Sequence, residues 1–139
     1  MDIRFVAGFG PIVSDPAVSS AFYRDTLGLP LETVAGEYVA MEGFDGVKHL
    51  GVWPLAAAAE SCFGRPSWPE DVPTPNATIE FELADADAVA AAAAELTEAG
   101  HQLIHQPRTE PWGQTIARLL DPDGLLVGLC HTPGLEPGA

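Results

Sequence analysis

The same order of predicted elements occurs twice along this chain: a strand, a helix and then three strands. This repeat limits the folds that the chain can adopt. Alternating apolar residues indicate the strands, and apolar residues at helical spacing indicate the helices. Each copy spans about 55 to 65 residues, which is marginal for an independent hydrophobic core. The two copies, or copies from two chains, must therefore share one core.

The boundaries of these elements come from capping residues and turns. In the first copy, Asp15-Pro16 begins the helix and Gly28 ends it. In the second, Asp85 or Asp87 caps an alanine-rich helix that Gly100 closes. The predicted strands cover residues 4–13, 31–34, 37–42 and 47–53, and then 77–83, 102–105, 114–120 and 125–131.

This pattern predicts an α+β fold of two tandem βαβββ modules. Their curved mixed sheets would carry the helices on the convex side and leave a cleft on the concave side. The expected divisions are a first module over 1–54, a Pro-rich linker over 55–75, a second module over 76–132 and a C-terminal tail over 133–139.

Composition limits the partners of the chain. The formal net charge is −14, with six Lys plus Arg, so a nucleic-acid partner is not expected. The acidity favours cationic small molecules or serves solubility alone, and both interpretations are open. No apolar run reaches the roughly 20 residues that span a membrane, and the start lacks the features of a signal peptide, so a cytoplasmic protein is expected. Cys62 and Cys130 form no metal-binding spacing and are expected to be free thiols.

Three short stretches resemble those of a known superfamily. They are FYRDTLGL at Phe22–Leu29, EPWGQT at Glu110–Thr115 and DPDG at Asp121–Gly124. Together with the doubled element order, they resemble the vicinal oxygen chelate superfamily of glyoxalases, bleomycin-resistance proteins and ring-cleaving dioxygenases. The EPWG stretch is similar to the bleomycin-resistance-like branch. That resemblance implies a homodimer with ligand pockets between sheets from two chains.

The resemblance also implies four strand positions for metal ligands. Carried onto this sequence, they fall on Gly8, Gly51, Thr78 and Gly128, which offer no strong donor. A shift of two residues would replace Gly51 by His49 and Thr78 by Glu80, and Gly10, Leu126 or Cys130 would then have to complete the set. We expect neither a metal nor another cofactor. The glycines either leave a hollow for a bulky flat molecule or permit bulges and tight strand crossing.

Strand alternation assigns side chains to the cleft face. Thr78, Glu80 and Glu82 would face the cleft, with Glu80 holding a cationic group and Glu82 solvated at the sheet end. His49 and Trp53 would share that face on the fourth strand. Arg118 could pair with Glu80 or with a ligand anion, but the pattern does not fix its face.

Aromatic residues complete the candidate site, and each has a structural alternative. Trp53 and Trp112 would stack on a ligand, or would anchor the core and plug the sheet end. Phe63 and Trp68 would cover a pocket mouth, or would brace the linker on the core. Tyr38 would offer a ring and a hydroxyl, or would be an ordinary half-buried side chain. The candidate ligand-binding set is Tyr38, His49, Trp53, Phe63, Trp68, Glu80 and Trp112.

The leading hypothesis is a metal-free binding protein that sequesters a small aromatic compound, with a cationic group as an option, such as an antibiotic. No nucleophile or phosphate-loop motif is present, so no catalytic residue is assigned. The alternative is an enzyme of the same superfamily, a metal-dependent or metal-free lyase, isomerase or dioxygenase. A structural module without a small ligand is a third hypothesis.

Overall fold

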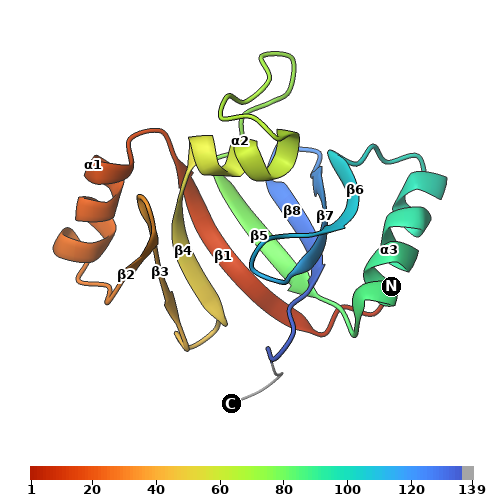
Figure 1. Ribbon diagram of the computed structural model, residues 1–139, viewed down its shortest axis with the longest axis horizontal. Coiled ribbons are helices and arrows are strands. Elements are labelled where there is room, and N and C mark those ends of the chain that lie inside the picture. The colour runs from red at the N-terminus through yellow and green to blue at the C-terminus, as the bar shows by residue number, and fades with distance from the viewer. Residues whose placement is uncertain (136–139) are drawn as a thin grey trace.

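The computed structural model describes residues 1–135, which form one eight-stranded mixed sheet with helices against it (Figure 1). The strand order is β2-β3-β4-β1-β5-β8-β7-β6. The predicted α+β fold with two βαβββ modules is confirmed. The strands are β1 Phe5–Val13, β2 Glu32–Ala35, β3 Tyr38–Glu42, β4 His49–Pro54, β5 Ala77–Glu82, β6 His105–Thr109, β7 Thr115–Leu120 and β8 Leu126–His131.

The two modules share a single sheet because their first strands pair with each other. β1 and β5 run antiparallel, and each also pairs in parallel with the last strand of its own module, β4 or β8. The remaining pairs, β2·β3, β3·β4, β6·β7 and β7·β8, are antiparallel. The shared core that two short modules require is thus built within one chain.

Both module helices cover the same face of the sheet, at its two ends (Figure 1). α1, Pro16–Ser20, begins at the Asp15 cap and continues into a π-helical stretch, η1, over Ala21–Thr26. Tyr23 of η1 packs near Val13, Val39 and Val52. α3, Ala86–Glu98, is capped by Asp85 and packs on Leu83, Ala117 and Leu129. Of the two predicted caps for this helix, the structure selects Asp85.

The predicted Pro-rich linker over 55–75 contains a helix that its composition did not predict. α2, Leu55–Phe63, begins directly after β4 and lies against the opposite face of the sheet. Ala58 and Cys62 of α2 pack on Ile12 and Leu126. We call the face opposite α1 and α3 the inner face, and α2 covers one end of it.

One predicted strand was misplaced. The strand expected over 102–105 is β6 at His105–Thr109, three residues later and with Pro107 inside it. β6 is the last strand of the sheet, and an edge strand tolerates a proline because its outer N–H groups have no ladder partner. The other strands begin and end within two residues of their predicted bounds.

The described residues cover only part of the predicted tail, and none of their helices could span a membrane. The predicted tail over 133–139 lies partly outside the described residues, which stop at residue 135. Within residues 1–135, no helix combines the length and apolar character needed to cross a bilayer.

Close contact between β1 and β4 explains one of the glycines. A Cβ on Gly10 would lie 2.1 Å from the Gly51 carbonyl oxygen, whereas a Cβ on Gly8 would meet nothing nearer than 3.4 Å. We therefore expect Gly10→Ala to reduce the free energy of unfolding by about 1–3 kcal/mol, because the strands must separate. Gly8→Ala is the matched control and should cost less. Urea unfolding of both variants tests this, and equal losses would contradict the strand contact.

Candidate functional site

One row of residues across the inner face gathers the polar chemistry of the sheet. Strand register aligns Glu42, His49, Gly8, Glu80, Gly128, Arg118 and His105, which come from β3, β4, β1, β5, β8, β7 and β6 in that order. We call these seven residues the polar row. The neighbouring row toward α2 is mostly apolar or small, with Ala40, Gly51, Gly10, Thr78, Leu126 and Leu120.

Glycines form the middle of this face, and neighbouring side chains fill most of the space they release. The Tyr38 ring and hydroxyl lie where a Cβ of Gly51 would be. Ile116 and Glu80 lie over Gly128 in the same way. At Gly8 the surroundings are looser, and a Cβ would lie 3.6 Å from Glu80 Oε1. The gap in side chains is therefore confined to Gly8, between His49 and Glu80.

On one side of Gly8, three side chains form a hydrogen-bonded chain. His49 Nε2 bonds the Tyr38 hydroxyl, and His49 Nδ1 lies 3.2 Å from Glu42 Oε1. A carboxylate only accepts, so we assign the ring hydrogen to Nδ1, and the Tyr38 hydroxyl then donates to Nε2. Burial raises the pKa of Tyr38, and the negative charges of Glu80 and Glu42 raise it further. The phenol therefore keeps its proton near neutral pH.

On the other side of Gly8, the side-chain amide of Gln114 holds Glu80. Gln114 Nε2 donates to Glu80 Oε1 at 3.0 Å and to Thr132 Oγ1 at 3.2 Å. The Trp112 indole N–H donates to Gln114 Oε1 at 3.0 Å, and Trp112 as a residue is 59% exposed. A polar chain thus connects an exposed indole with the carboxylate beside Gly8.

Farther along the row, Arg118 lies on the inner face and is fully buried. Its Nη1 donates to Glu110 Oε1 at 3.0 Å and lies 3.2 Å from His105 Nε2, and its guanidinium lies 5.5 Å from the Trp53 ring centre. The sequence did not fix the face of Arg118, and it offered Glu80 as partner. The structure pairs Arg118 with Glu110 instead.

Glu82 was expected to be solvated at the sheet end, and this expectation was wrong. The side chain is buried, with the residue 3% exposed. Its Oε2 accepts the Thr132 backbone N–H at 2.6 Å, and the Cys130 thiol donates to Oε1 at 3.5 Å. Residues that follow β8 fold over this end of the sheet, where Leu135 packs beside Cys130.

Three of the predicted aromatic ligand contacts lie in one apolar cluster with α2. Trp53, Phe63 and Trp68 pack against the buried side chains of Ile12, Cys62 and Leu126. The Phe63 and Trp68 rings meet edge to face at 4.8 Å, and the Trp68 N–H donates to the carbonyls of Val72 and Pro73. These rings brace the linker on the core. Within residues 1–135 no ring contact joins this cluster to Trp112.

The register changes the residues that are available to a metal. Gly51 and Thr78 pair with Gly10, so His49 and Glu80 are the side chains that flank Gly8. Both ring nitrogens of His49 already have partners, and the remaining two positions, Gly8 and Gly128, carry no donor. In the described part of the chain, no three His, Cys, Asp or Glu side chains are grouped as a metal requires. This residue set does not fit a divalent ion.

Two hollows lie away from the polar row. One of about 400 Å³ lies between the N-terminal residues and α3, and its lining combines four alanines with the charged side chains of Asp2, Arg4 and Glu95. The other, about 190 Å³, lies beside Glu82 and His131. The charged groups at the larger hollow pair with one another, Met1 with Glu95 and Arg4 with Asp2. We therefore place the candidate chemistry at the polar row, where hydrogen-bonded acidic and basic groups converge.

Sequence reasoning missed several residues of the site. Glu42, Glu110 and Gln114 were not singled out, although the last two belong to the EPWGQT stretch that carries the resemblance. The signal was available there, because a Glu and a Gln beside a constrained Trp can donate and accept inside the fold. The role of Glu42 depends on the β3·β4 register, which the sequence does not give.

Comparisons with known proteins agree with this architecture. The family model for the glyoxalase-like domain matches residues 9–132. No curated protein sequence matches the chain. Among solved structures, a Streptomyces coelicolor methylmalonyl-CoA epimerase variant in complex with 2-nitronate-propionyl-CoA is 21% identical, with 99% of this chain and 100% of that chain covered and a TM-score of 0.60.

Two further solved structures share the fold at lower identity. A glyoxalase/bleomycin resistance protein/dioxygenase superfamily member from Vibrio splendidus is 17% identical, with 94% and 100% of the two chains covered and a TM-score of 0.58. An NAD-dependent benzaldehyde dehydrogenase from Legionella pneumophila is 15% identical, with 89% and 96% covered and a TM-score of 0.59.

The environment of Tyr38 gives a prediction that needs no ligand. An ordinary tyrosine is half ionised near pH 10, whereas burial and two carboxylates keep Tyr38 protonated there. We expect the ultraviolet difference between wild type and Tyr38→Phe to show no tyrosinate at about pH 10. Unfolding the wild type in urea should restore ordinary titration. Half ionisation of Tyr38 at that pH in the folded protein would disprove the arrangement.

Proposed function

Because the chain belongs to the glyoxalase-like domain family, we propose that it is an enzyme that moves a proton on a small carbonyl compound without a metal. The observation that carries this proposal is the pair of proton-transfer groups on the two sides of Gly8. Glu80 lies on one side, and Tyr38, backed by His49 and Glu42, lies on the other. The reaction class is isomerisation or elimination.

The proposed step uses each group in a defined way. A Glu80 carboxylate oxygen takes a proton from the carbon next to the carbonyl, and the electron pair of that C–H bond moves to the carbonyl oxygen. The Tyr38 hydroxyl turns toward that oxygen and donates its proton as the charge develops. When the enol returns to the carbonyl form, its O–H proton goes back to Tyr38 and Glu80 returns its proton to carbon. His49, held by Glu42, keeps the Tyr38 hydroxyl in place.

The raised pKa of Tyr38 supports this assignment of roles. A phenol that keeps its proton donates a hydrogen bond, whereas a tyrosinate cannot. Glu80 receives one amide hydrogen bond on Oε1, from Gln114. This contact fixes the direction of the carboxylate, whose Oε1 lies beside Gly8 and is the oxygen that we assign to the substrate proton. Gln114 is thus a positioning residue.

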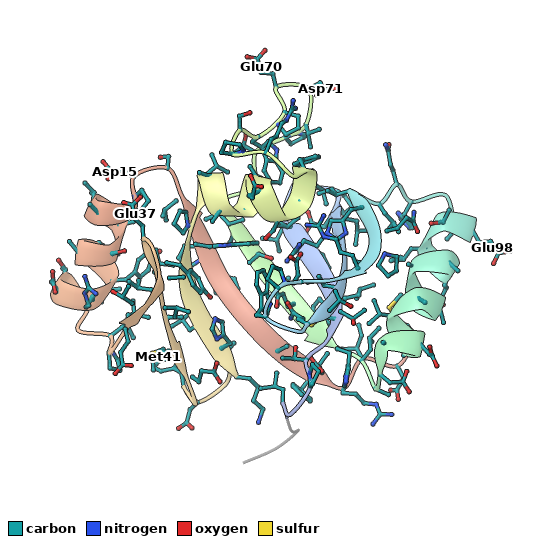
Figure 2. All side chains as sticks on the ribbon, viewed as in Figure 1. Asp15, Glu37, Met41, Glu70, Asp71 and Glu98 are labelled. Atoms are coloured by element: carbon teal, nitrogen blue, oxygen red, sulfur yellow. The ribbon has the colours of Figure 1, made fainter. Side chains whose placement is uncertain are left out.

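The fold relatives and the charge of the chain help to limit the substrate. One structural neighbour is a methylmalonyl-CoA epimerase, and that name describes proton chemistry on an acyl compound. For this chain we propose a substrate without phosphate groups, because a net charge of −14 opposes a polyanion. The labelled carboxylates of Figure 2 lie on the outside of the molecule and add to that opposing field.

Drug sequestration by stacked aromatic rings has less support in this structure. Trp53, Phe63 and Trp68 already pack with α2, so a flat ligand would have to displace them. Trp112 is the exposed ring of the candidate set that lies next to the polar row, and it suits one wall of a substrate site. The homodimer and the antibiotic ligand expected from the resemblance remain predictions.

The proposal is tested by exchange of carbon-bound protons for deuterium. Wild-type protein in D₂O, followed by NMR with a panel of small carbonyl compounds, should accelerate exchange next to the carbonyl in at least one of them. Glu80→Gln should slow that exchange by roughly 10²–10⁴-fold, because it keeps the shape and removes the base. Glu37→Gln, on the exposed turn before β3, is the matched control and should leave the rate unchanged.

Metal independence has its own outcome in the same assay. Dialysis against a chelator should leave the exchange rate unchanged. Loss of activity that stoichiometric zinc, nickel, manganese or iron restores would contradict the proposed mechanism. An unchanged rate in Glu80→Gln would contradict the role of that carboxylate.

A further inference from the structure

The Arg118 side chain keeps a pair of donors that its surroundings leave unused. Arg118 is 0% exposed, and its Nη1 alone is engaged, by Glu110 and His105. Within residues 1–135, Nε and Nη2 have no nitrogen or oxygen acceptor as a hydrogen-bond partner. These two N–H groups lie on the same edge of the guanidinium and point in parallel, which is the fork that binds a carboxylate through both oxygens.

The charges around Arg118 do not balance. Arg108 donates to the same Glu110 oxygen, at 3.2 Å from Nη2 and 3.3 Å from Nε, so two guanidinium groups share one carboxylate. Burial lowers the pKa of His105, and the nearby charges of Arg118 and Arg108 lower it further, so the imidazole is neutral. Two of the six basic residues of an acidic chain therefore meet around a single buried carboxylate.

The neutral neighbours do not supply the missing negative charge. Burial raises the pKa of the Cys62 thiol to about 11, although the charges of Arg118 and Arg108 and a hydrogen bond with Arg118 lower it, so this neighbour stays a neutral thiol. Trp53 stacks on the guanidinium and stabilises its positive charge without hydrogen bonds to its edge. A buried cation without a full counter-charge is costly, and a bound anion would relieve that cost.

We propose that the Arg118 fork is a binding site for the carboxylate group of a small ligand, held by Nε and Nη2. Glu110 fixes the guanidinium through Nη1, and the Trp53 ring lies against the guanidinium. The site differs from the proposed proton-transfer site, because Gly128 separates Arg118 from Glu80 along the polar row. Both donors are shielded from water, so an anion enters only when the residues that cover them move.

The test uses formate as the probe and chloride as its comparison at equal ionic strength. A formate concentration ten times its Kd should raise the melting temperature by roughly 3–6 °C, because formate binds the folded state. Chloride, which cannot accept from both donors in parallel, should give a smaller rise. The Arg118 Nε–H resonance should shift with formate in a ¹⁵N NMR titration, and Trp53 fluorescence should change with the same Kd.

Variants separate a built site from a general salt effect. Arg118→Lys keeps the positive charge but lacks the fork, so the formate-specific rise should disappear. Arg24→Lys, on exposed η1, is the matched control and should keep it. Should Arg118→Lys fail to fold, the Nε–H titration of wild-type protein decides. An unshifted resonance, or equal effects of formate and chloride, would overturn the proposal.

Two sources of the carboxylate are distinguished by comparing formate with pyruvate. Saturation by formate alone indicates a free small anion. A pyruvate Kd at least ten-fold lower than that of formate indicates a carboxylate on a larger ligand that extends along the polar row. Both results support the fork as a carboxylate site. Neither measurement depends on catalysis, so failure of the proposed proton transfer leaves this test intact.

Discussion

The antiparallel pairing of β1 with β5 is the constraint on which the rest of the structure depends. It joins two modules that are each too small for a stable core, and it sets the register that aligns residues from seven strands in the polar row. A change of register by two residues would place Thr78 instead of Glu80 beside Gly8. One strand pair thus fixes both the stability of the fold and the identity of the side chains that meet.

The two halves of the polar row handle their charges in different ways. The first module uses a hydrogen-bonded chain at a partly exposed edge, where Glu42 is exposed and His49 is half-buried. The second module buries Arg118 and Glu110 under the residues of β6 and α2, and it leaves part of the guanidinium unpaired. Burial makes an unpaired group costly, so this second arrangement supports the proposed carboxylate site, whereas the first supports the proposed proton transfer.

Local patterns in the sequence predicted the parts of the fold that depend on neighbouring residues. Strand alternation correctly placed Thr78 and Glu80 on the same face, and the Asp85 cap was one of two predicted helix starts. The helix α2 was missed because residues 55–75 were treated as one segment, and the prolines that follow α2 predict a linker. The burial of Glu82 and the alignment of His49 with Gly8 were missed because they depend on contacts between distant strands.

The central claim is that Glu80 and Tyr38, which His49 holds, act as proton-transfer groups on the two sides of Gly8, with no ion between His49 and Glu80. A crystal structure of the protein grown with excess zinc, with anomalous diffraction at the zinc edge, tests this most directly. The account predicts no anomalous peak beside Gly8 and an intact chain from Glu42 through His49 to Tyr38. A zinc ion about 2.0–2.2 Å from His49 Nε2 and Glu80 would contradict it.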